Sequence, residues 1–265
     1  MEFSNVRLKR QISIKKIRKI LMNLNTPVVH FVSYADDTTN RKGGEYVKTQ
    51  TQMNFFCKEY VPQIKVFHNF NYQTLLDSEL YKNDPELFDP KYFVSNKKER
   101  QLGKYVYKIY VIWETLKNNV NDCEYVLWHD SSPLKQWYDK KYQKNFNLDQ
   151  HINSCNKNQG ITCWTSKKRP KLSTYCSPEL MKDLNGLHLK NTLSCCTSWM
   201  IIKKTDHTLK ILNEILNYLK GDFYKKVHLN SKYDDSDQDV IDIILKKNNM
   251  NNHFIGMHKC ILEKE

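Results

Sequence analysis

Apolar runs and helical stripes alternate along the first half of the chain. A short β-branched and aromatic run predicts a buried strand at 28–37, and a helix at 46–60 leads to a second strand at 63–70. A strong amphipathic pattern predicts a helix over 104–118, and the run at 124–133 predicts a strand that ends in polar residues. This order favours an α/β/α sandwich of the Rossmann type with a mostly parallel central sheet.

The second half of the chain has a mixed pattern. Strands are predicted at 160–168 and 193–204, and helices at 207–220 and 235–247. The last helix has an acidic first turn, which suits the helix dipole. Residues 81–100 are expected to be irregular, residues 135–160 to be loop with some helix, and the tail 251–260 to be strand or loop. Because no internal repeat and no Gly/Ser-rich linker interrupts the pattern, we expect one domain over residues 1–265.

The N-terminal segment is a separate feature within that domain. Residues 4–25 combine basic side chains with apolar ones at helical spacing, so residues 1–25 are expected to hold a basic helix. We favour packing of its apolar stripe on the domain; the alternative is peripheral contact with an anionic membrane. No apolar run has the length of a membrane span, and the start does not resemble a secretory signal. The expected location is therefore the cytoplasm, or the host cytoplasm for a viral protein.

The charge balance first suggests a nucleic-acid partner. The 265 residues include 42 Lys+Arg and 29 Asp+Glu, which gives a net charge of +13. Only six of the 42 basic residues are Arg, the residue that reads phosphates and guanine edges best. The enrichment in Lys, Asn, Ile and Tyr fits an A/T-rich genome, such as that of a large DNA virus, which places Lys on a solvated surface. We therefore expect no nucleic-acid partner, and the alternative is electrostatic binding of acidic or phosphorylated ligands.

The sequence lacks the motifs of several common classes of enzyme and metal site. The eight cysteines include no C-x-x-C, which favours reduced thiols, several of them in the core. Cys176 and Cys196 are potential nucleophiles in principle, but neither is paired with a base in the sequence. No G-x-G-x-x-G, Walker, H-E-x-x-H or G-x-S-x-G motif is present. These absences argue against a dinucleotide dehydrogenase, a P-loop kinase, a zincin and an α/β-hydrolase.

Polar residues instead gather at four places where strands end or a helix begins. They are Ser33-Tyr34-Ala35-Asp36, Trp128-His129-Asp130-Ser131-Ser132, Ser236-Asp237-Gln238-Asp239 and the spaced residues His253, Gly256 and Lys259. Open α/β sheets bind ligands outside the carboxyl ends of their strands. The pattern therefore predicts a ligand site at that edge of the sheet.

These places resemble the motifs of nucleotide-sugar glycosyltransferases with the GT-A fold. The stretch 103–133 resembles the helix and strand that lead into the D-x-D element, as in capsular-type enzymes of viruses, algae and bacteria. The sequence DQDVID at 237–242 resembles the D-Q-D motif of the glycogenin and lipopolysaccharide-galactosyltransferase family, and HFIGMHK at 253–259 is similar to its H-x-x-G-x-x-K. The order of these motifs agrees over about residues 28–260.

The resemblance implies an enzyme that transfers a sugar from a nucleoside diphosphate, UDP rather than GDP, to a glycan or protein acceptor. It implies retention of anomeric configuration and assistance by Mn²⁺ or Mg²⁺. The metal ligands it implies are Asp130, Ser132 and His253, and the catalytic residues are Asp237, Gln238 and Asp239. The donor would be bound by the following residues: Ser33, Tyr34, Ala35, Asp36, Lys108, Asp130, Ser132, Thr197, Gly256 and Lys259.

Two departures from the family pattern leave alternatives open. Ser132 stands where the second Asp of D-x-D is expected, and a hydroxyl is a weaker metal ligand than a carboxylate. The metal would then be weakly bound, bound through water, held by other ligands such as the adjacent His129, or absent. Cys196-Thr197-Ser198 replaces the Asn–small–Gly of the sugar-contacting strand. The second hypothesis is thus a binding protein that has lost its transferase activity.

Overall fold

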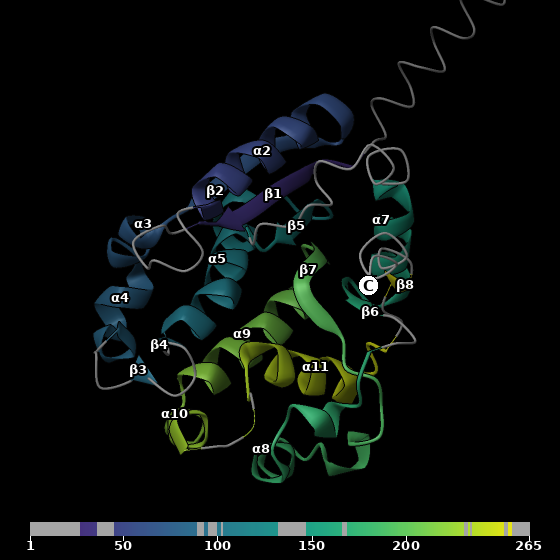
Figure 1. Ribbon diagram of the computed structural model, residues 1–265. Helices are drawn as coiled ribbons and strands as arrows, with labels where there is room; N and C mark the ends of the chain where they lie inside the picture. Colours follow the sequence, from purple (N-terminus) through teal and green to yellow (C-terminus); the bar gives the residue numbers. More distant parts are fainter. Residues whose placement is uncertain are drawn as a thin grey trace, which may run out of the picture.

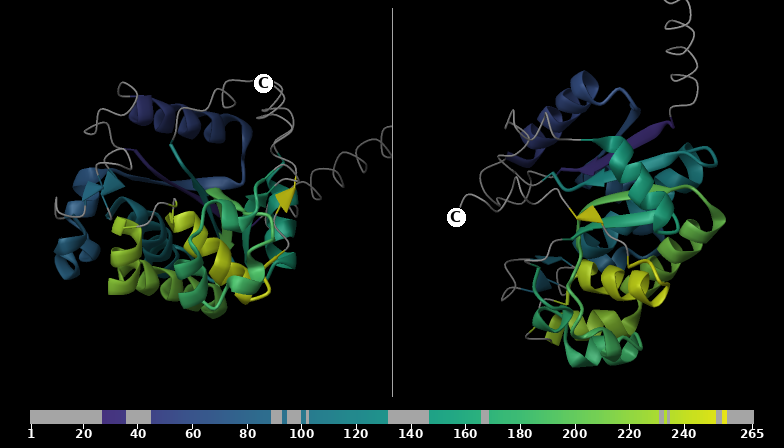
Figure 2. Two further views of the ribbon diagram at one scale, coloured as in Figure 1. Left: turned by 60° about the horizontal axis from the view of Figure 1, so that its bottom comes forward. Right: turned by 90° about the vertical axis from the view of Figure 1, so that its right-hand side faces the viewer.

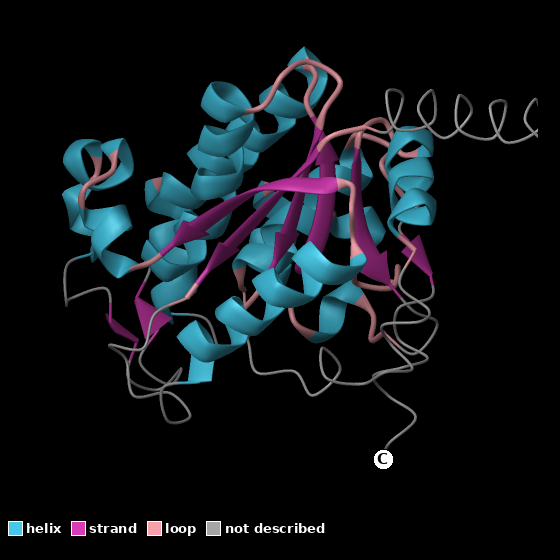
Figure 3. Ribbon diagram, turned by 90° about the horizontal axis from the view of Figure 1, so that it is seen from above, coloured by secondary structure: helices cyan, strands magenta, loops and turns pink. Residues whose placement is uncertain are grey.

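A mixed β-sheet between two layers of helices forms the centre of the protein (Figures 1 and 3). The computed structural model describes residues 27–35, 45–88, 93–94, 100–101, 103–131, 147–165, 169–230, 233, 235–251 and 254–255. The strands lie in the order β2-β1-β5-β7-β6-β8. Their bounds are Val29–Tyr34 for β1, Ile64–Phe70 for β2, Tyr125–His129 for β5, Ile161–Thr165 for β6, Cys196–Lys203 for β7 and Phe254–Ile255 for β8.

The direction of one strand corrects the predicted mostly parallel sheet. β1 pairs in parallel with both β2 and β5, and β6 pairs in parallel with β8. β7, however, is antiparallel to both of its neighbours, β5 and β6. The sheet is therefore mixed, and alternation of strands and helices could not predict this. β7 therefore begins at the edge of the sheet where β5 and β6 end.

Helices α2 (Glu45–Tyr60) and α7 (Leu148–Lys157) cover one face of the sheet. Phe56 of α2 and Ile152 of α7 belong to one buried cluster together with Phe31 of β1 and Leu127 of β5. Asn147 caps α7 by accepting a hydrogen bond from the Gln150 amide. Burial of these apolar side chains holds the layer on the sheet.

Helices α5 (Gly103–Asn119), α9 (Asp206–Lys220) and α11 (Asp237–Lys247) cover the other face. Figure 2 shows α2 on one side of the sheet and α9 and α11 on the other from two further directions. Their buried side chains form the larger apolar cluster, with Val32, Val126 and Met200 from the sheet. A capping box of Thr205 and Thr208 starts α9. No helix of the described residues is both long and apolar enough to cross a membrane.

A compact excursion links β2 to α5 where the sequence predicted mainly irregular chain. It contains α3 (Tyr72–Leu76), α4 (Glu79–Asn83), the 3-10 helix η1 (Pro85–Phe88) and the short pair β3 (Phe93–Val94) and β4 (Arg100–Gln101). Two ion pairs fasten it to α9 and α10 (Asp222–Asn230): Lys220 to Asp84 at 2.6 Å and Lys225 to Glu86 at 3.2 Å. These long-range contacts explain why local periodicity missed the excursion.

A second excursion separates β6 from β7. It contains the 3-10 helix η5 (Leu172–Thr174), helix α8 (Pro178–Asp183) and the 3-10 helix η6 (Leu187–Leu189). Gly186 packs so closely on α11 that an added Cβ would lie 2.7 Å from Cγ2 of Ile243. The excursion therefore supports α11, the helix that begins with Asp237.

Two further predictions concern the cysteines and the N-terminal helix. The seven described cysteines are free thiols, and five of them are buried: Cys57, Cys155, Cys163, Cys176 and Cys195. This agrees with the expectation of reduced thiols in the core. The predicted basic helix at 4–25 lies outside the described residues.

Candidate functional site

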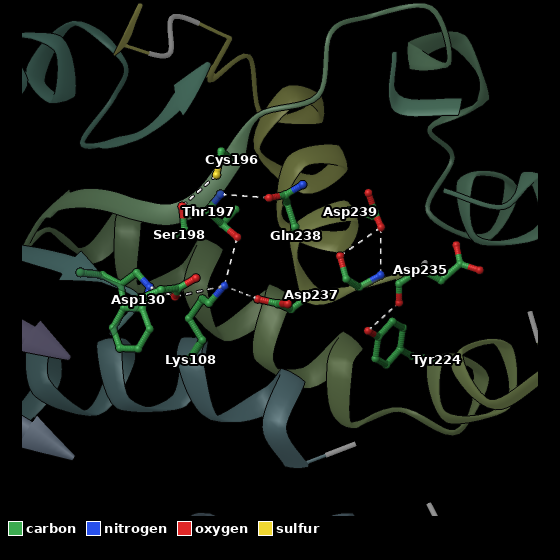
Figure 4. A network of polar contacts seen from close by, with 12 residues as sticks. Lys108, Asp130, Cys196, Thr197, Ser198, Tyr224, Asp235, Asp237, Gln238 and Asp239 are labelled. Carbon is green, nitrogen blue, oxygen red and sulfur yellow. Dashed lines mark hydrogen bonds and ion pairs between the residues drawn. The ribbon is translucent and has the colours of Figure 1, made fainter. Parts of the chain in front are cut away.

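Five elements bring polar residues to one edge of the sheet. β1 and β5 end at this edge with Tyr34 and His129, whereas the reversed strand β7 begins there with Cys196. Helix α11 begins with Asp237 beside the start of β7, and α5 places Lys108 against the same cluster (Figure 4). The reversal of β7 is what brings Thr197 to the edge predicted as the ligand site.

The Lys108 ammonium group lies at the centre of this cluster. Its Nζ is 2.8 Å from Oδ2 of Asp237 and 3.7 Å from Oδ1 of Asp130, and it donates a hydrogen bond of 3.2 Å to Oγ1 of Thr197. The four residues come from α5, the end of β5, β7 and α11. Lys108 thus joins four parts of the chain that are far apart in the sequence.

The buried setting of Lys108 is compensated by its neighbours. Burial alone would lower the pKa of the Lys108 ammonium group, because the charged form loses solvation. The carboxylates of Asp130 and Asp237 outweigh this effect and raise the pKa above its usual value. Lys108 is therefore a fixed positive charge at neutral pH. With two carboxylates beside it, the cluster has a formal charge of −1.

Asp130 is held by both its backbone and its side chain. Its amide donates to the carbonyl of Ser198 at 2.8 Å, which extends the pairing of β5 with β7. The indole Nε1 of Trp128 donates to Oδ1 at 2.9 Å. The second carboxylate oxygen, Oδ2, has no hydrogen bond or ion pair to the part of the chain that the structure describes, and the side chain is 29% exposed. Within the described residues, one oxygen of Asp130 thus has no polar partner.

The three residues of the predicted D-Q-D motif have different contacts. Asp237 faces Lys108. Gln238 accepts a hydrogen bond of 3.4 Å from the amide of Thr197. Asp239 turns back to Ser236, whose amide and hydroxyl donate to its Oδ2 at 2.9 and 3.2 Å in a capping box. Asp239 thus stabilises the start of α11, a role that the spacing of Ser236 and Asp239 already signals.

A second Lys–Asp pair, missed in the sequence, fixes the start of β7 on α11. Asp242 is fully buried and accepts a hydrogen bond of 3.0 Å from the amide of Cys195. Lys246 lies 2.8 Å from Oδ1 of Asp242 and donates to the carbonyl of Leu193 at 2.8 Å. The i,i+4 spacing of Asp242 and Lys246 is visible in the sequence, but their burial is not. This pair sets the position of β7 and thereby of Thr197.

Two residues predicted at the end of β1, Ser33 and Ala35, are engaged in the fold. Ser33 is buried; its hydroxyl donates to Asn69 at 3.2 Å and accepts from Gln50 at 3.1 Å. The amide of Ala35 donates to the carbonyl of Phe70 at 3.0 Å. These contacts join the end of β1 to β2 and α2. The predicted roles of Ser33 and Ala35 in binding the nucleotide-sugar stay predictions.

An aromatic chain connects Tyr34 with the carboxylate cluster. The ring of Tyr34 lies 4.2 Å from that of Tyr107, which lies 6.2 Å from the ring of Trp128. Trp128 in turn donates to Asp130. The end of β1 is therefore connected to the site through packed side chains of α5 and β5.

His129 is directed away from the Lys108 cluster. It follows Trp128 on β5, so strand alternation places it on the opposite face. Its Nδ1 lies 2.6 Å from the carbonyl oxygen of Asp130, and burial lowers its pKa to about 4. A neutral His129 that donates to this carbonyl explains its position. The alternative of His129 as a metal ligand next to Asp130 is not favoured by this geometry.

Five predicted site residues lie outside the described residues: Asp36, Ser132, His253, Gly256 and Lys259. Within the described ranges, no three His, Cys, Asp or Glu side chains are grouped as ligands of one metal ion. The predicted set of Asp130, Ser132 and His253 extends beyond those ranges, so the metal stays a prediction. A comparison of the chain with protein-family models, with curated proteins and with solved structures finds no match.

Proposed function

We propose that the protein is a glycosyltransferase that uses a nucleoside-diphosphate sugar, with UDP preferred to GDP, and a glycan or protein acceptor. The observation that carries the proposal is the position of Lys108 between Asp130 and Asp237. These residues are separated in the sequence, and the resemblance implied that all three meet the donor. We also propose that the mixed sandwich is of the GT-A type, with the donor at the edge where β5 ends and β7 begins.

Charge explains why this cluster suits a diphosphate leaving group. Cleavage of the anomeric C–O bond leaves negative charge on the diphosphate, which a fixed ammonium group such as Lys108 stabilises. The cluster alone carries a formal charge of −1, so a donor would bind more tightly with a divalent cation. Asp130 fits such a cation because its Oδ2 is open, and Ser132 and His253 would complete the ligand set. The cation, when bound, acts as a Lewis acid on the diphosphate.

The other residues of the cluster would bind and orient the sugar. The carboxylate of Asp237 could accept hydrogen bonds from sugar hydroxyls while Lys108, 2.8 Å away, fixes its orientation. The side chain of Gln238 is held against β7 because it accepts a hydrogen bond from the amide of Thr197. The hydroxyl of the same Thr197 accepts a hydrogen bond from Lys108. A rigid arrangement of this kind lowers the cost of orienting the donor.

The test is a binding and turnover screen with UDP- and GDP-sugars, with and without Mn²⁺. We expect calorimetric binding to the wild type, with donor hydrolysis or transfer, and a loss of about 10²–10³ in turnover for Asp130→Asn and Asp237→Asn. Asp149→Asn is the matched control, because Asp149 is an exposed carboxylate in α7. Absence of binding to every donor, or site variants that equal the control, would contradict the proposal.

A binding protein without transferase activity is the second candidate. It is favoured by Ser132 at the second D-x-D position and by Cys196-Thr197-Ser198 at the sugar-contacting strand. Under this alternative the same screen gives binding of a nucleotide-sugar that depends on Asp130 and Asp237 but no turnover with any acceptor. Transfer to one acceptor would exclude it.

A further inference from the structure

Trp128 is a buried aromatic residue whose indole N–H needs a partner and has a carboxylate as that partner. Its side chain is fully buried in the larger apolar cluster. The one polar atom of the indole, Nε1, donates to Oδ1 of Asp130 at 2.9 Å. Because Trp128 and Asp130 are two residues apart at the end of β5, strand alternation directs both side chains to the same face.

Among the described residues, the side-chain contacts of Asp130 are all on one of its two carboxylate oxygens. Oδ1 accepts from the Trp128 indole and lies 3.7 Å from Nζ of Lys108, while Oδ2 has neither kind of contact to the described residues. We propose that Trp128 is a positioning residue that fixes the Asp130 carboxylate so that Oδ2 faces the divalent cation of the bound donor. This inference rests on the proposed function.

The chemistry of indole suits this role. Indole is a donor only, so it cannot compete with Asp130 for a cation. It is also neutral, so it orients the carboxylate and leaves the negative charge in place, whereas a second lysine would cancel that charge. The ring is itself held, because Tyr107 packs 6.2 Å away and Tyr34 packs 4.2 Å from Tyr107. The orientation of Asp130 is therefore set by a rigid aromatic chain.

The hydrogen bond can be tested without any ligand. The chain has five tryptophans, which give five indole N–H signals in a ¹⁵N NMR spectrum. The signal that is missing in Trp128→Phe belongs to Trp128. If Trp128→Phe does not fold, Trp→Phe variants of the other four tryptophans assign their own signals, and the remaining signal is that of Trp128. We expect Asp130→Ala to shift this signal and the control Asp149→Ala to leave it in place. An unchanged Trp128 signal in Asp130→Ala would overturn the inference.

The positioning role is tested by titration of Mn²⁺ at a fixed nucleotide-sugar concentration. Loss of a partner that orients a metal ligand typically weakens metal affinity or activity by about 10–100-fold. We therefore expect Trp128→Phe to raise the Mn²⁺ concentration for half-maximal donor binding by about that factor. Trp113→Phe is the control, because Trp113 is a half-buried residue of α5 whose ring lies 4.7 Å from Nζ of Lys117.

Two outcomes separate this inference from the proposed function. Donor binding with the same Mn²⁺ dependence in Trp128→Phe and the wild type would overturn the positioning role alone. Absence of donor binding by the wild type, at any Mn²⁺ concentration, would overturn the proposed function and this inference with it.

Discussion

Two buried Lys–Asp clusters lie close together in this protein and differ in how completely their charges are matched. Asp242 and Lys246 form a one-to-one pair, and each also bonds a backbone group of the chain leading into β7. Lys108 instead faces two carboxylates, and Asp130 keeps a partly exposed side chain with one open oxygen. In the first cluster one lysine faces one carboxylate, whereas in the second one lysine faces two. Under the proposed function, the first is a structural ion pair and the second is the donor site.

The largest expected effect comes from breaking the satisfied pair. Lys246→Met leaves Asp242 as an uncompensated buried charge, which typically costs about 3–5 kcal/mol. Urea unfolding monitored by circular dichroism measures the loss. The double variant Asp242→Leu/Lys246→Met removes both charges, so we expect it to regain much of the stability. A single variant within about 0.5 kcal/mol of the wild type would show that the pair does not support β7.

Breaking the unmatched cluster should affect ligand binding more than stability. Lys108→Met leaves two carboxylates, but the partly exposed Asp130 remains solvated, so we expect a loss of about 1–3 kcal/mol in unfolding free energy. Binding of the nucleotide-sugar should fall below detection in calorimetry, because the fixed cation for the diphosphate is gone. Lys247→Met, an exposed change in the last turn of α11, is the control. Wild-type donor affinity in Lys108→Met would contradict the comparison.

The smallest expected effect is a pH dependence of the same variant. The pKa of Lys108 is raised in the folded protein, so its contribution is complete below the unfolded value of about 10.4 and is lost as pH rises through the folded value. The difference in unfolding free energy between the wild type and Lys108→Met should stay constant from about pH 7 to 10 and shrink only above that. Urea unfolding over this range measures it. A difference that already shrinks between pH 7 and 9 would show that Lys108 is not held in its charged form.

The sequence predicted most of the elements and only part of the site geometry. Long periodic segments such as α5, α9 and the buried strand β5 were identified because apolar spacing alone defines them. The short helices α4 and α8 escaped, since they depend on local caps and on distant contacts such as Lys220 with Asp84. Periodicity also carries no information on strand direction, so the reversal of β7 was not predictable.

Within the site, residue types were easier to predict than contacts. The sequence identified Lys108, Asp130 and Asp237 as candidates, and the structure brings them together. It did not distinguish Asp237 from Asp239, although the Ser236–Asp239 spacing of a capping box was available. The contact of Trp128 with Asp130 was missed because a sequence pattern does not show which partner the indole N–H of a strand residue reaches. Side chains that combine a core position with a polar tip are the ones that sequence patterns assign least well.

The order of these elements along the chain also matters for folding during synthesis on the ribosome. Lys108 and Asp130 are synthesised more than a hundred residues before Asp237, and Asp242 of α11 bonds the chain that leads into β7. Contacts between such distant parts of a chain form late, because loop closure is costly until most of the core is in place. The completed cluster is thus a marker of a nearly finished fold. A nascent chain that ends before α11 would contain Lys108 and Asp130 but lack Asp237, the nearer carboxylate partner of Lys108.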